Sequence, residues 1–132
     1  MLQKWHTNRK LRISVHLLII STFLIYFFIV NEDHVLKIEK ISPPKTKVGQ
    51  GFNIQPQGTS VIWIETEGLS NDSIVVVWGE IKLDTIVHLE KQIVTACVPE
   101  ELFSTQGDFE IYLIDFENNI RSNKAIFKVL KD

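Results

Sequence analysis

Residues 108–130, DFEIYLIDFENNIRSNKAIFKVL, decide the fold, because two segments that alternate between apolar and polar residues flank a turn. A period of two places one set of side chains on a single face of a β-strand. Glu117-Asn118-Asn119, between the segments, is typical of a hairpin turn. The sets that share a face are Phe109, Ile111 and Leu113 in Asp108–Phe116, and Ala125, Phe127 and Val129 in Lys124–Leu130.

Similar segments recur upstream, so residues 31–132 are expected to be all-β. Val and Ile supply 23 of these 102 residues and Ala only two, which favours strands over helices. This length fits one Ig-sized β-sandwich. Pro43-Pro44 ends the first strand, and Pro99-Glu100-Glu101-Leu102 predicts one helical turn. The other expected strands are Val35–Ile41, Gly51–Gln55, Ser60–Glu65, Ile74–Trp78, Glu80–Asp84 (with Ile81 and Leu83 on one side) and Gln92–Val98.

The overall composition excludes two classes of protein. The 132 residues include 14 Lys and Arg against 16 Asp and Glu, so the net charge is −2. A chain with this balance is not a basic protein that coats nucleic acid, and we expect no nucleic-acid partner. A single Cys excludes an internal disulfide framework and a Cys-rich zinc site.

Residues 13–30, ISVHLLIISTFLIYFFIV, predict one transmembrane α-helix. They contain no Asp, Glu, Lys or Arg, and thirteen of the eighteen are Leu, Ile, Val or Phe. At about 1.5 Å per residue the helix measures ~27 Å, close to the bilayer hydrocarbon core of ~30 Å. This core is long for a signal peptide, and no A-x-A-like cleavage site follows it. We therefore favour an uncleaved signal-anchor over a cleaved signal peptide or a buried soluble helix.

The flanking charges predict the orientation of this helix. Residues 1–12 carry a net charge of +4, and residues 31–132 carry a net charge of −6. The positive-inside rule places the basic segment 1–12 in the cytoplasm and the domain at 36–132, after a short linker at 31–35, on the other side. The short chain without a disulfide favours a single-pass protein of the bacterial inner membrane, with a periplasmic or extracellular domain.

Five collinear motifs between residues 36 and 130 resemble the IPT/TIG family of immunoglobulin-like domains. They are Ile38–Pro43 (IEKISP), Val48–Ile54 (VGQGFNI), Val94–Pro99 (VTACVP), Gly107–Leu113 (GDFEIYL) and Ser122–Val129 (SNKAIFKV). The stretch Leu69–Lys91 is longer and more apolar than in a minimal member. The resemblance implies an Ig-like β-sandwich that serves recognition or spacing, and it transfers no catalytic residue. We therefore expect a non-catalytic, membrane-anchored binding or scaffolding module with a protein partner in the envelope.

No constellation of residues predicts catalysis or metal binding. A small hydrolase with His88 as its base and Asp84 nearby is a minor alternative, because no G-x-S-x-G sequence supplies a nucleophile. Carboxylates and histidines are scattered rather than spaced as ligands, so we expect no metal and no cofactor. Cys97 is expected to be a partly buried thiol, with an intermolecular disulfide left open.

Three aromatic residues are candidates for core packing or recognition. Trp63 resembles the buried Trp of a central Ig strand and is expected in the core. Trp78 and Tyr112 form the candidate binding surface, because an exposed ring could stack on a sugar or anchor a protein partner. The main alternative function is therefore a glycan-binding accessory module for an envelope polysaccharide enzyme. Asn71-Asp72-Ser73 is a glycosylation sequon, relevant only in a eukaryotic secretory pathway.

Overall fold

The computed structural model describes residues 35–132, which form a compact unit. The basic segment at 1–12, the transmembrane helix predicted at 13–30 and residues 31–34 of the linker lie outside the described residues. In the part that is described, none of the helical segments has the length and apolar character that a membrane crossing requires.

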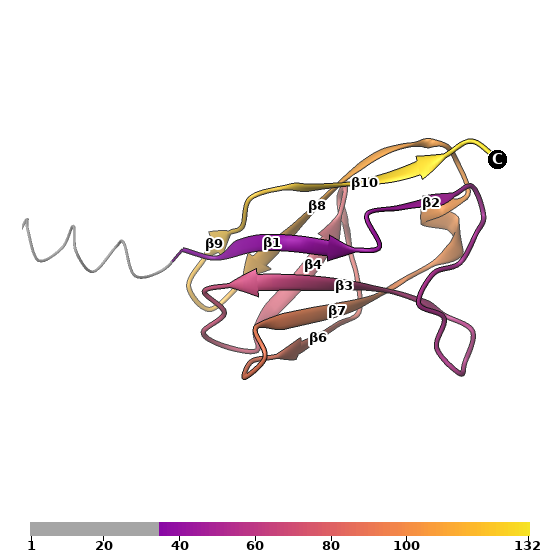
Figure 1. Ribbon diagram of the computed structural model, residues 1–132. Helices are drawn as coiled ribbons and strands as arrows, with labels where there is room; N and C mark the ends of the chain where they lie inside the picture. The colour runs from indigo at the N-terminus through magenta and orange to yellow at the C-terminus, as the bar shows by residue number, and fades with distance from the viewer. Residues whose placement is uncertain (1–34) are drawn as a thin grey trace, which may run out of the picture. The chain divides into compact units, whose positions relative to one another are not determined.

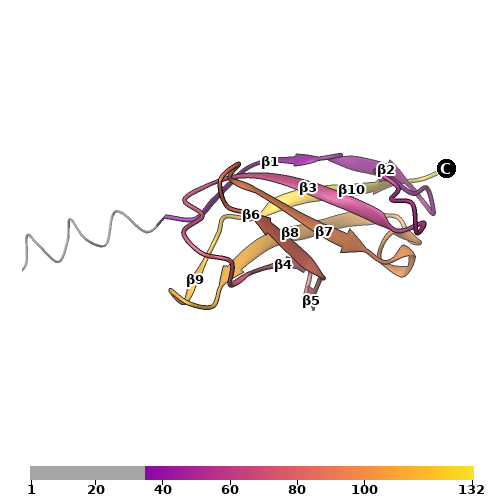
Figure 2. The ribbon, with the colours of Figure 1, turned by 90° about the horizontal axis from the view of Figure 1, so that it is seen from below.

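Ten strands build two sheets among the described residues. Figures 1 and 2 show the arrangement of the two sheets from two directions. Sheet A is antiparallel, in the order β1 (Lys37–Ser42), β3 (Ser60–Glu67), β7 (Ile93–Val98) and β6 (Thr85–His88). Sheet B has the order β2 (Lys45–Lys47), β10 (Ala125–Leu130), β8 (Gly107–Asp115), β4 (Ile74–Trp78) and β5 (Ile81–Lys82), with β9 (Ile120–Arg121) beside β8. Within sheet B, β2 pairs with β10 in parallel. A 3₁₀ turn, η1 (Glu100–Phe103), leads from β7 to β8.

The core lies between the two sheets, because one face of each sheet is apolar. Its most deeply buried side chains are Ile62, Ile64 and Val94 from sheet A, and Val76, Ile111, Leu113, Phe127 and Val129 from sheet B. Burying one such side chain contributes about 1.5–3 kcal/mol. The alternation predicted for residues 108–130 is thus confirmed. The described domain is all-β, with two sheets arranged as in a β-sandwich.

The sequence located most of the strands. β1, β3, β4, β7, β8 and β10 and the turn η1 confirm the predictions, with their ends within two residues of those expected. The chain leaves sheet A at Pro43-Pro44, as expected, and enters sheet B as β2. The sequence missed the short strands β2, β6 and β9, because each has at most four residues and therefore almost no periodic pattern.

The strand predicted at Gly51–Gln55 is wrong, because these residues form a loop. Asn53 has a φ of 42°, which interrupts an extended backbone. Phe52 turns into the core, where its ring centroid lies 5.2 Å from those of Phe103 and Phe127. The apolar residues of this segment therefore fill the end of the core without joining a sheet.

The prediction for Glu80–Asp84 is also wrong in part. β5 contains only Ile81 and Lys82, Ile81 is exposed and Leu83 is buried, so Ile81 and Leu83 do not share a side. The physical reason is that the chain crosses from sheet B to sheet A here, between β5 and β6. Leu83 fills the core at the crossing, where its N–H donates to the carbonyl of Val76 at 2.9 Å.

Candidate functional site

Trp63 lies on the outer face of sheet A, and the expectation that it belongs to the core is wrong. Its neighbours in β3, Ile62 and Ile64, are fully buried. Because successive side chains in a strand point to opposite faces, Trp63 must point outward, and 47% of its surface is exposed. The Ile-Trp-Ile alternation was the signal in the sequence that could have placed it.

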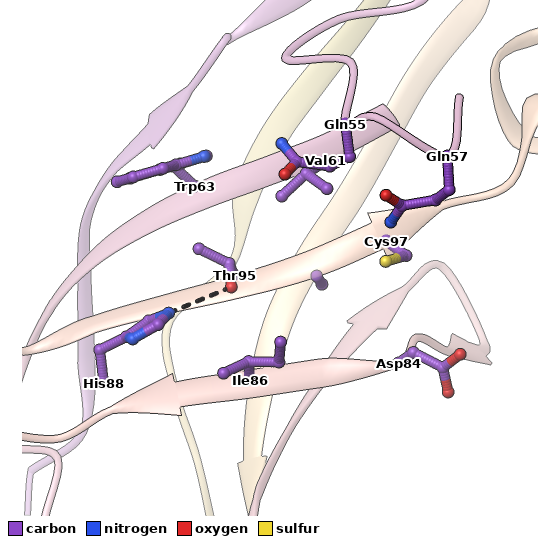
Figure 3. A pocket seen from close by; sticks show the side chains of 10 residues that line it. Gln55, Gln57, Val61, Trp63, Asp84, Ile86, His88, Thr95 and Cys97 are labelled. Carbon is purple, nitrogen blue, oxygen red and sulfur yellow. Dashed lines mark hydrogen bonds between the residues drawn. The ribbon is translucent and has the colours of Figure 1, made fainter. Parts of the chain in front are cut away.

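Trp63 begins a row of side chains that crosses three strands. It lies opposite Thr95 of β7, and Thr95 lies opposite Ile86 of the edge strand β6. Ile86 is 62% exposed. In the adjacent position, Val61 of β3 lies opposite Cys97 of β7. We call this outer surface the Trp63 face, and Figure 3 shows it together with its polar residues Gln55, Gln57, Asp84 and His88.

The Trp63 face forms an open concavity of about 300 Å³. Gln55 and Gln57 reach it from the loop before β3, and this loop is fixed by hydrogen bonds of Gln55, from its N–H to the Thr59 carbonyl at 2.9 Å and from its amide to the Asn53 carbonyl at 3.0 Å. The side chains of Gln57 and Asp84 make no hydrogen bond to another described residue. Their polar atoms are therefore free to bind a ligand.

The residues of the hydrolase alternative also lie on the Trp63 face. The distance from His88 Nε2 to Thr95 Oγ1 is 3.4 Å, beyond the reach of about 2.6–3.2 Å expected between a nucleophile and its base. No hydrogen bond between described residues joins Asp84 to His88. Cys97 is a free, partly buried thiol, as predicted. Within residues 35–132, no group of three or more His, Cys, Asp or Glu could hold a metal ion.

Trp78 is buried, so it cannot form an exposed binding surface as expected. Only 2% of its surface is accessible, and its ring centroid lies 4.9 Å from that of Phe127 and 5.6 Å from that of Phe109. It ends β4, in which Ile74, Val76 and Trp78 all belong to the core. Its indole Nε1 has no hydrogen-bond partner among the described residues.

Tyr112 is half-buried on the outer face of sheet B, as its alternation with Ile111 and Leu113 predicts. Two cations lie over its ring, the guanidinium carbon of Arg121 at 5.6 Å and Nζ of Lys124 at 6.0 Å from the centroid. Lys124 also contacts Glu110 at 3.0 Å. Tyr112 and Trp78 therefore point to opposite sides of sheet B and do not form one surface.

Asp115, at the end of β8, is a buried carboxylate that the sequence analysis did not single out; only 1% of its surface is exposed. It accepts hydrogen bonds from the N–H groups of Glu117 and Asn118, both at 3.0 Å. It also accepts bonds from the side-chain amides of Asn118 at 2.9 Å and Asn71 at 3.1 Å. Asp115 thus joins the β3–β4 loop to the β8–β9 turn.

The environment of Asp115 sets its protonation. Burial raises the pKa of its carboxyl, but the hydrogen bonds from Asn118, Asn71 and Glu117 outweigh burial and hold the pKa below the ordinary value of 3.8. The glycan of a sequon would be attached to Nδ2 of Asn71, the atom that binds Asp115. Asn71 therefore has a structural role in the described domain.

Comparison with known proteins gives no family for this chain. No family model matches the sequence, and no curated protein matches it at a significant level.

Proposed function

We propose that this chain is a non-catalytic binding or scaffolding module and that the Trp63 face is its recognition surface. The domain is Ig-like, of the IPT/TIG type, and residues 13–30 hold it on the outer side of the inner membrane as an uncleaved signal-anchor. The N-terminus lies in the cytoplasm. The partner is a protein assembly of the envelope or the membrane.

The order of the strands supports the Ig-like part of the proposal. Ig domains place strands A, B, E and D in one sheet and strands C, F and G in the other. With the strands lettered along the chain, β1, β3, β7 and β6 take the places of A, B, E and D, and β4, β8 and β10 take those of C, F and G. A buried Trp on strand C is a feature of antibody domains, and Trp78 of β4 has this position. The five sequence motifs carry the finer IPT/TIG assignment.

The observation that carries the proposal is the exposure of Trp63 on a face that is partly apolar and partly polar. Trp is enriched among the residues that dominate binding energies. The ring is 47% exposed, and a partner that covered this part, about 100 Å² of a side chain of roughly 200 Å², would gain roughly 2 kcal/mol. In the isolated domain this exposed apolar area contributes no burial energy to folding.

The anchor increases the effect of such a contact. Six residues, 31–36, separate Val30 from the first strand, so the proposed span would keep the domain close to the membrane surface. Tethering raises the local concentration of the domain there, and a weak contact at the Trp63 face then suffices for occupancy.

The test is co-purification of the full-length protein from its native membrane in mild detergent, followed by mass spectrometry. Four forms are compared, namely wild type, Trp63→Ala, Tyr112→Ala and a form with an unrelated membrane span. Tyr112→Ala is the matched control, because it removes an aromatic side chain from the outer face of the other sheet. We expect a partner that is lost from Trp63→Ala and kept by Tyr112→Ala.

The other outcomes separate the parts of the proposal. A partner lost only with the unrelated span would place recognition on residues 13–30, against the Trp63 face. A partner kept by Trp63→Ala but lost from Tyr112→Ala would move recognition to sheet B. If no protein is enriched by any form, the proposal of a protein partner fails.

A further inference from the structure

The Trp63 face also carries information about the chemical group that it contacts in the envelope assembly, and this inference rests on its proposed role as the recognition surface. The exposed side chains of Trp63 and Ile86 provide apolar contact area, while amide, carboxylate and imidazole groups surround it. Its volume of about 300 Å³ lies at the small end of the range for small-molecule sites. A ligand that fits must therefore offer apolar surface to the middle of the face and polar groups to its ends.

A pyranose ring meets both requirements. One side of the ring presents C–H groups, whose slight positive charge favours the negative π face of an aromatic ring. Its hydroxyl groups project from the edge, and each can donate and accept a hydrogen bond. Trp63 supplies an accessible aromatic ring of this kind, whereas Trp78 is buried and Tyr112 is covered by two cations.

The polar groups of the face include both donors and acceptors, which hydroxyl groups can pair with. The amide of Gln57 offers donors and an acceptor, the carboxylate of Asp84 offers acceptors, and the two ring nitrogens of His88 add further polar atoms. Figure 3 places Trp63 and His88 at one end of the face, and Gln57 and Asp84 at the other. Polar groups therefore lie at both ends of the apolar middle.

The distance between these ends favours more than one sugar unit. Val61 and Trp63 are two residues apart on β3, and two residues of a strand span about 7 Å. If one sugar ring stacks on Trp63, Gln57 and Asp84 can therefore bind the next sugar unit of the saccharide. The face suits an oligosaccharide better than a single sugar.

The charge of the face selects among saccharides. Asp84 is a carboxylate, and neither Lys nor Arg lines the concavity. A uronic acid or a phosphorylated sugar would bring a second negative charge next to Asp84 with no cation to balance it. We propose that the Trp63 face binds a neutral oligosaccharide, with one ring stacked on Trp63 and the next unit hydrogen-bonded to Gln57 and Asp84.

Titration of the full-length protein with defined oligosaccharides tests this proposal. A Trp5→Phe background leaves Trp63 and Trp78 as the fluorophores, and phosphocholine micelles avoid detergents with sugar headgroups. The probes are cellohexaose, chitohexaose and maltohexaose, with hexagalacturonate as the anionic comparison. Fluorescence of Trp63 reports stacking, and calorimetry measures the affinity of variants that lack this ring.

We expect saturable binding of at least one neutral probe and an affinity for hexagalacturonate at least about tenfold lower. Trp63→Ala should lower the affinity for the neutral probe at least about tenfold, and Gln57→Ala should lower it severalfold. Tyr112→Ala should leave the affinity unchanged. The emission of the buried Trp78 shows whether each variant is folded.

Three outcomes would overturn the inference: no saturable binding of any neutral probe at millimolar concentration, equal binding by Trp63→Ala, or preference for hexagalacturonate. The co-purification test distinguishes this failure from failure of the proposed function. If a protein partner depends on Trp63 but no saccharide binds, the proposed function as a binding module holds and only the saccharide inference fails. If neither a saccharide nor a protein depends on Trp63, both proposals fail.

Discussion

Replacing Asp115 with Asn should destabilise the domain by about 2–3 kcal/mol at pH 7. The carboxylate is buried and accepts bonds from two backbone N–H groups and from the amides of Asn71 and Asn118. Hydrogen bonds to a charged group contribute about 1.5–3 kcal/mol each, against about 0.5–1.5 kcal/mol for neutral ones. The new NH₂ group, in the place of Oδ2, would also face two donors, the side-chain amides of Asn71 and Asn118.

One of these two donors can adapt and the other cannot. The amide of Asn118 can turn and offer its oxygen. Asn71 is fixed, because its Oδ1 already accepts the N–H of Ser73 at 2.7 Å. Asn71 therefore loses its contact with one of the two former carboxylate oxygens and keeps its bond at 3.1 Å to the other. All the remaining bonds lose the contribution of the negative charge, which gives the estimate of about 2–3 kcal/mol.

The assay is urea unfolding of the full-length protein in micelles, between pH 7 and pH 3. The pKa of Asp115 is lower in the folded domain than the ordinary value of 3.8, so its charge stabilises the folded state above this value. The stabilisation is lost as the pH falls through the folded pKa. The difference between wild type and Asp115→Asn should therefore shrink below pH 3.8.

Asp108→Asn is the matched control, because Asp108 is exposed and its carboxylate has no hydrogen bond to another described residue. It should change the unfolding free energy by less than about 0.5 kcal/mol. The reasoning is refuted if Asp115→Asn is as stable as this control at pH 7. It is also refuted if the difference from wild type stays constant down to pH 3.

Three further predictions concern the core, a turn and the surface. Trp78→Ala should cost about 3–5 kcal/mol of unfolding free energy, but Trp78→Phe less than about 1.5 kcal/mol, because it removes a buried N–H without a partner; equal losses in urea unfolding would contradict this. Gly68→Ala should lower the unfolding free energy by more than about 3 kcal/mol, because φ is 86° and the new Cβ would collide with the Val35 carbonyl oxygen. Gly49 has a φ of 71° but lies in open space, so Gly49→Ala should lower it by only about 1–2 kcal/mol. Thermal unfolding compares the two variants. In a Trp5→Phe background, iodide should quench Trp63 and not Trp78, and quenching that persists in Trp63→Phe would show that Trp78 is accessible.

The position of the candidate site could be predicted only in part from the sequence. The alternation Ile62-Trp63-Ile64 was enough to place Trp63 outside the core, but the likeness to a central Ig strand assigned it to the inside. Trp78 ends a continuous apolar run, in which a period of two cannot be seen, so no local pattern decided its side. The pairing of β4 with β8 and the packing against Phe127 decided it.

Composition and a period of two were enough to predict the all-β class, six of the strands and the inward faces of β8 and β10. Which strands share a sheet depends on pairing between residues far apart in the chain, and no local pattern could predict it. For this reason one surface combines residues from four parts of the chain: Gln55 and Gln57 from a loop, Trp63 from β3, Thr95 from β7, and His88 of β6 with Asp84 just before it. The buried bonds of Asp115 to Asn71, 44 positions away, have the same origin.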